Sequence, residues 1–363
     1  MSARRALLAS LLLALAACGR SPTGPDPMPS SGGTQSVSVV VFYDENGNGA
    51  LDASEAVRVP DVEVSLGGRS ARSAAGSGRA VIDGVPSGAF TPAVSSSTLP
   101  PFYALGRIGA VQVPAAGDVP VPLTLPIGSN RSNTYMAFGD SITAGDNYPG
   151  DPSYRGPLQQ KLQQYFGRAT VIGEGVGSTK SNQGAERIDG VLSADRPAYT
   201  LILYGTNDWN LSECKTVTRL ATTCFTIASL RDIILSVKGS SSLPVLATIP
   251  PVNVGYSIFV PGPREDWLEA ANVQVRDLAR EQGAALADVE KAFLAVGDTS
   301  RLFVDHIHPS AEGEELIASA FFQAIARRGT GSAFTGEVTE LDGPVLLAAP
   351  RMPPARAAQA RRR

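Results

Sequence analysis

The sequence is poor in histidine and cysteine and has no marked excess of charge of either sign. Its 363 residues include two histidines and three cysteines, and the formal net charge is −3 at pH 7. This near-neutral balance gives no indication of nucleic-acid binding. Beyond the N-terminus, no segment is long and apolar enough to span a membrane. Both histidines lie within Asp305-His306-Ile307-His308, so no other segment offers a competing histidine base.

The N-terminus has the pattern of a secretion signal. Two arginines precede a short apolar core at residues 7–16. Leu15-Ala16-Ala17-Cys18 resembles a bacterial lipobox, which implies a lipoprotein signal peptide over residues 1–17 and lipidation of Cys18. The protein is then expected to be exported and anchored to a membrane of the bacterial cell envelope, periplasmic or surface-facing. The alternative is a plain signal peptide with an incidental cysteine.

Composition divides the rest of the chain. Residues 18–34 are rich in Ser, Pro and Gly and are expected to form a flexible tether. Residues 35–128 contain short runs of Val and Ser separated by turn signals, which predict a separate all-β sandwich domain. Residues 131–329 carry the motifs described below. Residues 330–363 are a tail rich in Pro, Ala and Arg, whose basic end is expected to be disordered.

A loop in the β-rich region matches the calcium pattern D-x-[DN]-x-[DN]-G-x₅-E at every required position. It follows a strand instead of a helix, so it is not a complete EF-hand. The segment resembles the calcium-binding B-type domains of bacterial surface proteins, which continue, as here, with Gly-Val-Pro-Ser-Gly at residues 84–88. The resemblance implies a Ca²⁺ site, and the alternative is a turn that joins two strands. The expected ligands are Asp44, Asn46, Asn48, the Ala50 carbonyl, Asp52 and Glu55.

Three polar segments carry the chemistry of the larger region. Gly139-Asp140-Ser141 follows an apolar run at 135–138, and Gly205-Thr206-Asn207-Asp208 follows another at 199–204. The third segment is Asp305-His306-Ile307-His308-Pro309. Open α/β sheets bind ligands at the carboxyl ends of their strands. In this order, the three segments resemble blocks I, III and V of the GDSL (SGNH) serine hydrolases.

The family resemblance implies an α/β fold, a three-layer α/β/α doubly wound parallel sheet. The remaining pattern of alternating strands and helices agrees with it. Apolar runs at 245–249 and 284–287 predict further parallel strands. Helices are predicted over 220–238, 266–281 and 311–328, with Pro309 fitting the first turn of the last one.

By the same resemblance, Ser141 is the nucleophile, His308 the general base and Asp305 the residue that orients it. A serine hydroxyl needs an adjacent base. Histidine titrates near neutral pH, and a carboxylate on its other nitrogen fixes the tautomer. His306 is the alternative base, but it lacks the three-residue spacing from Asp305.

The implied oxyanion hole has three donors: the Ser141 N–H, the Asn207 side-chain amide and one backbone N–H from block II. Block II departs from the family pattern. In one register Gly173 replaces the usual asparagine and Ser178 replaces the final glycine, whereas a one-residue slip places Gly177 at the donor position. Asp140 and Asp208 are expected to bind loop backbone.

Two rival motifs are excluded. Ser141 lacks the surrounding Gly-x-Ser-x-Gly of the α/β-hydrolase elbow. The glycine-rich stretch at 173–181 lacks the Gly-Lys pair of a phosphate loop. Catalysis is expected to need no cofactor, since no set of metal ligands surrounds Ser141 in the sequence.

Cys214 and Cys224 follow block III in a polar stretch. In an exported protein a disulfide between them is expected, and it would stiffen a loop beside Asn207. Two free cysteines are the alternative.

The sequence thus predicts an exported, lipid-anchored serine esterase that cleaves carboxylic esters through an acyl-enzyme. The resemblance leaves the substrate open among acetylated carbohydrates, lysophospholipids and small acyl esters. The alternative is a non-catalytic envelope module whose β-domain binds a glycan or a protein.

Overall fold

The computed structural model describes residues 33–145, 147–148, 151–215 and 224–327. The predicted signal peptide, Cys18, nearly all of the tether and the C-terminal tail lie outside these residues. From Thr34 onward the chain is one compact unit by its contacts, so the predicted boundary between residues 128 and 131 remains a prediction. No helix within the described ranges has the length and apolarity needed to cross a membrane.

The N-terminal part of the described chain is all β, as predicted. Its four-stranded sheet has the order β4 (Arg79–Pro86), β1 (Thr34–Tyr43), β9 (Val119–Thr124), β7 (Ala104–Leu105). A three-stranded sheet contains β3 (Arg69–Arg72), β2 (Glu63–Leu66) and β6 (Ala93–Val94), and a third pairs β5 (Gly88–Phe90) with β8 (Val111–Val113). Alternate residues of β1, such as Val39 and Val41, share a buried core with Val64 and Leu66 of β2. The two larger sheets therefore pack face to face, as in a sandwich.

The second part is built on a five-stranded sheet in which each neighbouring pair is parallel. Its order is β11 (Thr170–Gly175), β10 (Arg131–Gly139), β12 (Pro197–Leu203), β13 (Leu243–Ala247), β14 (Ala285–Ala287). The chain runs from β10 to β11 on one side, then crosses to β12 on the other. This reversal of direction is the topological switch point of a doubly wound sheet, where ligands bind.

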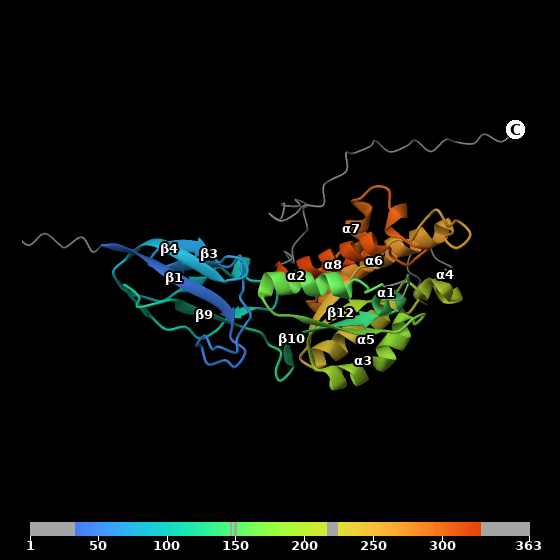
Figure 1. Ribbon diagram of the computed structural model, residues 1–363. Coiled ribbons are helices and arrows are strands. Elements are labelled where there is room, and N and C mark those ends of the chain that lie inside the picture. The colour runs from blue at the N-terminus through green and yellow to red at the C-terminus, as the bar shows by residue number, and fades with distance from the viewer. Residues whose placement is uncertain (1–32, 146, 149–150, 216–223, 328–363) are drawn as a thin grey trace, which may run out of the picture. The chain divides into compact units, whose positions relative to one another are not determined.

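Helices cover both faces of this sheet (Figure 1). One face carries α2 (Arg155–Phe166) and α8 (Ala311–Ala326), and the other carries α3 (Ser181–Asp195), α5 (Thr226–Gly239) and α6 (Gly262–Gln282). Successive residues of β10 alternate between two cores: Tyr135 and Ala137 face α2 and α8, whereas Met136 and Phe138 face α3 and α5. The short helices are α1 (Ser141–Ala144), α4 (Ser212–Lys215) and α7 (Val289–Leu294). The predicted three-layer α/β/α architecture is confirmed.

The placement of Pro309 differs from the prediction. It lies before α8, whose N-cap is Ser310, and forms an isolated antiparallel bridge with Phe303. The Ser310 N–H donates to the Leu302 carbonyl, and its hydroxyl accepts from the Gly313 N–H. Pro309 is therefore in extended backbone that returns the chain toward residue 303, and the helix begins two residues later.

Candidate active site

Ser141 stands at the carboxyl end of β10, where the strand gives way to α1. The Asp140 carboxylate caps this turn by accepting the Ile142 N–H at 3.0 Å. Gly139 has no space for a side chain, because a Cβ there would overlap Thr143 Oγ1 and the Leu203 carbonyl oxygen. The close approach of β10, β12 and the turn thus requires glycine before the Asp-Ser pair and places the serine hydroxyl at the edge of the sheet.

Ser141 and His308 are 167 residues apart in sequence and in contact in the fold. Ser141 Oγ lies 2.9 Å from His308 Nε2, and His308 Nδ1 lies 2.7 Å from Asp305 Oδ2. Asp305 Oδ1 accepts two backbone N–H groups, from Ile307 at 2.8 Å and from His308 at 2.7 Å. Burial raises the pKa of Asp305, but these hydrogen bonds outweigh it and hold the pKa below its usual value. The carboxylate is therefore ionised where it meets the imidazole.

His306 points elsewhere. Its ring packs against that of Phe259, with 5.2 Å between the centroids, and its Nδ1 lies 3.8 Å from Asp305 Oδ1. Burial lowers the pKa of His306. Of the two histidines, His308 alone reaches Ser141 among the described contacts.

The predicted oxyanion donors gather at the ends of three neighbouring strands, β10, β11 and β12. Asn207 follows β12, and its Nδ2 donates to the Thr179 carbonyl at 3.0 Å, which leaves its second N–H for another acceptor. The N–H groups of Ser141, Gly177 and Ser178 make no hydrogen bond to another described residue. Ser178 has a φ of 61°, a left-handed conformation that favours glycine. Gly177 does not have a positive φ. This difference favours the register in which Ser178 replaces the final glycine of block II.

Asp208 binds loop groups, as predicted. Its carboxylate accepts the Ser181 N–H at 2.9 Å, the Ser181 hydroxyl at 2.6 Å and the Thr226 hydroxyl at 2.7 Å. Burial raises the pKa of Asp208. Burial, with the nearby charge of Asp208, also raises the pKa of Asp140 to about 7, although the Ile142 N–H opposes this shift. Both carboxylates therefore shape the loops and have no contact with His308 among the described residues.

Arg187 on α3 is a part of the site that the sequence analysis missed. Its guanidinium lies over the Phe138 ring, 4.2 Å from the centroid. Its Nη2 donates to the Gly139 carbonyl at 3.2 Å, to the Tyr204 hydroxyl at 2.9 Å and to the Glu174 carbonyl. It thus links the ends of β10, β11 and β12. An arginine on an amphipathic helix has the pattern of a solvated charge, so the sequence carries no signal for this role.

Cys214 and Cys224 form the expected disulfide, with their Cα atoms 4.9 Å apart. Both cysteines are buried in a small core with Trp209 and Trp267. Trp209 lies two residues after Asn207, so the disulfide belongs to the packing that supports the loop carrying this residue.

The loop from Asp44 to Glu55 is held by its own side chains. Asp52 Oδ2 accepts from the amide nitrogens of Asn46 at 2.7 Å and Asn48 at 2.8 Å, so these three expected calcium ligands are neighbours. Glu55 accepts backbone N–H groups from Glu45 and Asp52. Within the described ranges, no group of three or more His, Cys, Asp or Glu side chains is placed to hold a metal ion. The oxygen-rich loop has the donor chemistry that Ca²⁺ prefers, but ion binding remains a prediction.

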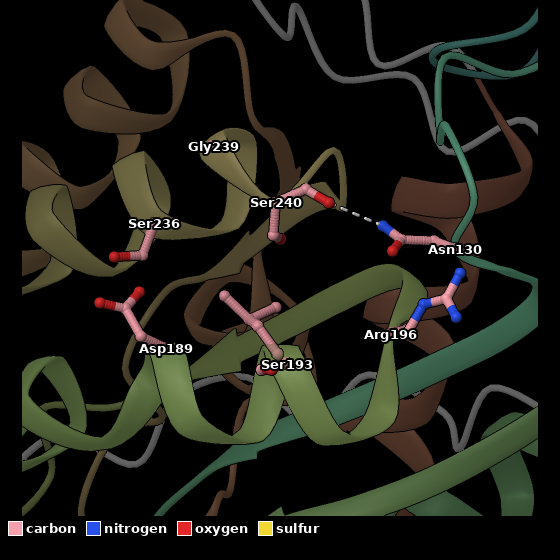
Figure 2. A pocket seen from close by; sticks show the side chains of 8 residues that line it. Asn130, Asp189, Ser193, Arg196, Ser236, Gly239 and Ser240 are labelled. Atoms are coloured by element: carbon pink, nitrogen blue, oxygen red, sulfur yellow. Dashed lines mark hydrogen bonds between the residues drawn. The ribbon is translucent and has the colours of Figure 1, made fainter.

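An open hollow of about 480 Å³ lies between α3 and α5 (Figure 2). Asp189 and Arg196 contribute charge to it, and Asn130 donates to the Ser240 carbonyl across one end. Arg196 directly precedes β12, so the hollow lies toward the amino ends of the strands. Ser141 lies at the opposite edge, and the hollow is not part of the candidate site. Its lining residues are Asn130, Asp189, Leu192, Ser193, Arg196, Ser236, Gly239 and Ser240.

Residues 137–316 match the model of the GDSL-like Lipase/Acylhydrolase family. No curated protein matches the chain. Similar solved structures include an acetylxylan esterase from Geobacillus stearothermophilus, at 22% identity and a TM-score of 0.45 over 56% of this chain and 100% of the other. A lipase/acylhydrolase from Enterococcus faecalis is 19% identical, with a TM-score of 0.43 over 53% of this chain and 95% of the other. An alpha/beta hydrolase from the Lake Arreo metagenome is 20% identical, with a TM-score of 0.45 over 54% of this chain and 96% of the other. The family match identifies residues 137–316 as a GDSL-like lipase/acylhydrolase domain and the protein as a hydrolase that acts on ester bonds.

Proposed function

We propose that the protein is a serine esterase that cleaves carboxylic esters through an acyl-enzyme formed on Ser141. The observation that carries this proposal is the hydrogen-bonded line from Ser141 Oγ through the His308 ring to Asp305. In this arrangement Nε2 can take the serine proton while Nδ1–H donates to an ionised carboxylate. These are the requirements for activating a serine hydroxyl.

The reaction proceeds in two steps. Ser141 Oγ attacks the ester carbonyl carbon as His308 takes its proton, and the carbonyl oxygen becomes an oxyanion. The N–H groups of Ser141 and Ser178 and the remaining amide hydrogen of Asn207 stabilise this charge. His308 then gives the proton to the departing alcohol, which leaves Ser141 acylated. Water, deprotonated by His308, attacks the acyl-enzyme and releases the carboxylic acid and the free serine.

A fluorophosphonate probe tests the nucleophile. One adduct on the intact protein, mapping by peptide mass analysis to Ser141, is the expected result. Ser141→Ala should remove both the adduct and the hydrolysis of p-nitrophenyl acetate, whereas Ser178→Ala, which retains its backbone N–H, should still be labelled. Labelling at another residue would contradict the assignment.

The alternative is a non-catalytic envelope module that binds a glycan or protein through its β-rich region. The aligned triad argues against it, because a binding module has no need of a serine, histidine and aspartate in line. A burst of p-nitrophenol on mixing the wild type with p-nitrophenyl acetate distinguishes the two, since only acylation releases the phenol at once.

We also propose that the protein is exported and held at the membrane by lipid on Cys18. The lipobox pattern and the Ser/Pro/Gly-rich residues after it support this proposal. Two acyl chains anchor a protein stably, whereas one gives marginal binding. Wild type should fractionate with membranes and carry a lipid mass on Cys18, and Cys18→Ser should not. If the wild type is soluble and Cys18 is unmodified, the lipid anchor is wrong and the protein is a secreted esterase without it.

Ca²⁺ binding by the β-rich region is a further proposal, supported by the motif and by the contacts of Asp52 with Asn46 and Asn48. Asp44, the Ala50 carbonyl and Glu55 would complete the ligand set. The ion would stabilise the loop, and catalysis at Ser141 would not require it.

A further inference from the structure

Large apolar side chains are exposed on one loop, residues 254–259, between β13 and α6. Ile258 is 89% exposed, Phe259 58%, Val254 55% and Tyr256 42%. The sequence of the loop, Val-Gly-Tyr-Ser-Ile-Phe, contains no charged residue. Exposed apolar groups that gather in one place mark binding sites more often than scattered single ones.

This loop is tied to the segment that carries the triad. At its start, the Asn253 N–H donates to the His306 carbonyl at 3.0 Å and its side chain to the Asp305 carbonyl at 3.3 Å. At its end, Phe259 packs on the His306 ring. The exposed side chains therefore stand beside the residues that orient the general base.

Buried Arg264 ties the same loop to the oxyanion side. Its guanidinium donates to the Phe259 carbonyl at 3.3 Å and to the Thr206 carbonyl at 3.1 Å. Thr206 is the residue before Asn207. Two further exposed apolar residues neighbour the site in sequence, Val304 before Asp305 and Val176 before Gly177. The loop is thus tied by hydrogen bonds to segments on both sides of the candidate active site.

We propose that Val254, Tyr256, Ile258 and Phe259 form a platform for the hydrocarbon chain of the ester, which makes the enzyme selective for apolar acyl groups. This inference rests on the proposed function and assigns its substrate class. An ester held with its carbonyl at Ser141 must direct its acyl or alcohol group along neighbouring surface. The neighbouring surface here offers methyl groups and rings without charge, so burying hydrocarbon against it is favourable and a charged head group finds no opposite charge on the loop.

The test compares kcat/KM for p-nitrophenyl octanoate and p-nitrophenyl acetate, both kept below micelle-forming concentrations. For the full chain, Ile258→Ser and Phe259→Ser should each lower the octanoate-to-acetate ratio by about tenfold, chiefly through KM. The matched controls are Leu235→Ser on α5 and Val273→Ser on α6, whose side chains are 51% and 53% exposed. Neither control should change the ratio.

An unchanged ratio in both loop variants, with turnover that still depends on Ser141, would overturn the platform and leave the proposed function intact. Hydrolysis of both esters by Ser141→Ala would reject the proposed function and the platform with it. Sedimentation with phosphatidylcholine vesicles distinguishes a lipid surface as the occupant. If the loop variants lose vesicle binding and keep the wild-type ratio, the loop contacts a bilayer instead of the acyl chain, and the proposal is wrong.

Discussion

His306 and His308 are two residues apart, yet the backbone gives their rings different partners. His308 contacts Ser141 and Asp305, while His306 packs on Phe259. We expect His308→Ala to lower kcat by several orders of magnitude, because the serine loses its base. His306→Ala should lower kcat far less, since it removes a packing contact. Steady-state kinetics on p-nitrophenyl acetate provide the comparison, and an equal fall in both variants would contradict the assignment of the base.

Two neighbouring carboxyl groups, those of Glu314 and Asp151, share one proton. Glu314 on α8 is almost completely buried, and its Oε2 accepts from the Tyr148 hydroxyl at 2.9 Å. Burial and a hydrogen bond with Asp151 raise the pKa of Glu314 to about 8. Burial alone would raise the pKa of Asp151, but hydrogen bonds from Glu314, Asn147 and Ser153 lower it. The proton therefore lies on Glu314 at neutral pH and joins it to the ionised Asp151.

This pair makes stability depend on pH. The pKa of Glu314 in the folded protein, about 8, exceeds the value of about 4.3 for an exposed glutamate. Its stabilising contribution is thus complete below about pH 4 and is lost as the pH rises through about 8. The side chain of Glu314→Gln cannot ionise, so the melting temperature of this variant should fall less between pH 5 and pH 9 than that of the wild type. The exposed Glu269→Gln is the control and should follow the wild type, whereas parallel curves for all three proteins would contradict the protonated pair.

At the scale of the elements, the turn after β11 carries strain at one residue. Ser178 has a φ of 61°, and this conformation costs a residue with a side chain about 1–2 kcal/mol. Ser178→Gly should raise the free energy of unfolding by up to about 1 kcal/mol, after the entropic cost of glycine is subtracted. Its kcat/KM should change little, because the backbone N–H remains.

Urea unfolding and ester kinetics measure both effects. Gly177→Ala is the matched control, since a Cβ at that position meets no atom within 4 Å. A loss of 10² or more in kcat for Ser178→Gly would mean that the Ser178 hydroxyl acts in the site, because losses of that size follow removal of an oxyanion donor.

The disulfide between Cys214 and Cys224 stabilises the element that follows block III. The bond closes a loop between residues separated by ten positions, and chain entropy predicts about 3 kcal/mol of stabilisation. Cys214→Ala/Cys224→Ala should unfold at lower urea concentration than the oxidised wild type. A reducing agent should shift the wild type and leave the double variant unchanged. If the wild type does not respond to reduction, the disulfide contributes no stability.

At the scale of the whole molecule, Ca²⁺ is expected to stabilise the full chain. An ion that binds only the folded state adds RT ln(1 + [L]/Kd), or about 2.7 kcal/mol at 100 times Kd. The melting temperature should therefore rise with Ca²⁺ and fall again with a chelator. Asp52→Ala, which removes an expected ligand, should abolish this response. A melting temperature that is indifferent to Ca²⁺ in the wild type would reject the site.

The parallel sheet assembles the candidate site at the ends of β10, β11 and β12, together with the loop before α8. The family resemblance, the apolar runs and the motifs at their ends were sufficient to predict the sheet and the placement of Ser141 and Asn207 at its edge. The close contact of Asp305 with His308 was also predictable, because three residues in one turn bring the side chains together without help from the rest of the fold. The predicted placement of Pro309 in the first turn of the last helix was wrong. The fixed φ of proline suits both a first helical turn and the extended bridge that the structure shows, so the residue type could not distinguish them.

The sequence by itself determined the fold class and the residues of the triad through the short motifs that resemble the GDSL family, since each motif depends only on neighbouring residues. Only the tertiary structure decided which block II residue adopts the left-handed turn and where the apolar loop 254–259 lies. It also decided the roles of Arg187 and Glu314, whose partners come from strands or loops far away in sequence. Those contacts arise from packing between elements, so the partners of Arg187 and Glu314 exist only in the folded chain.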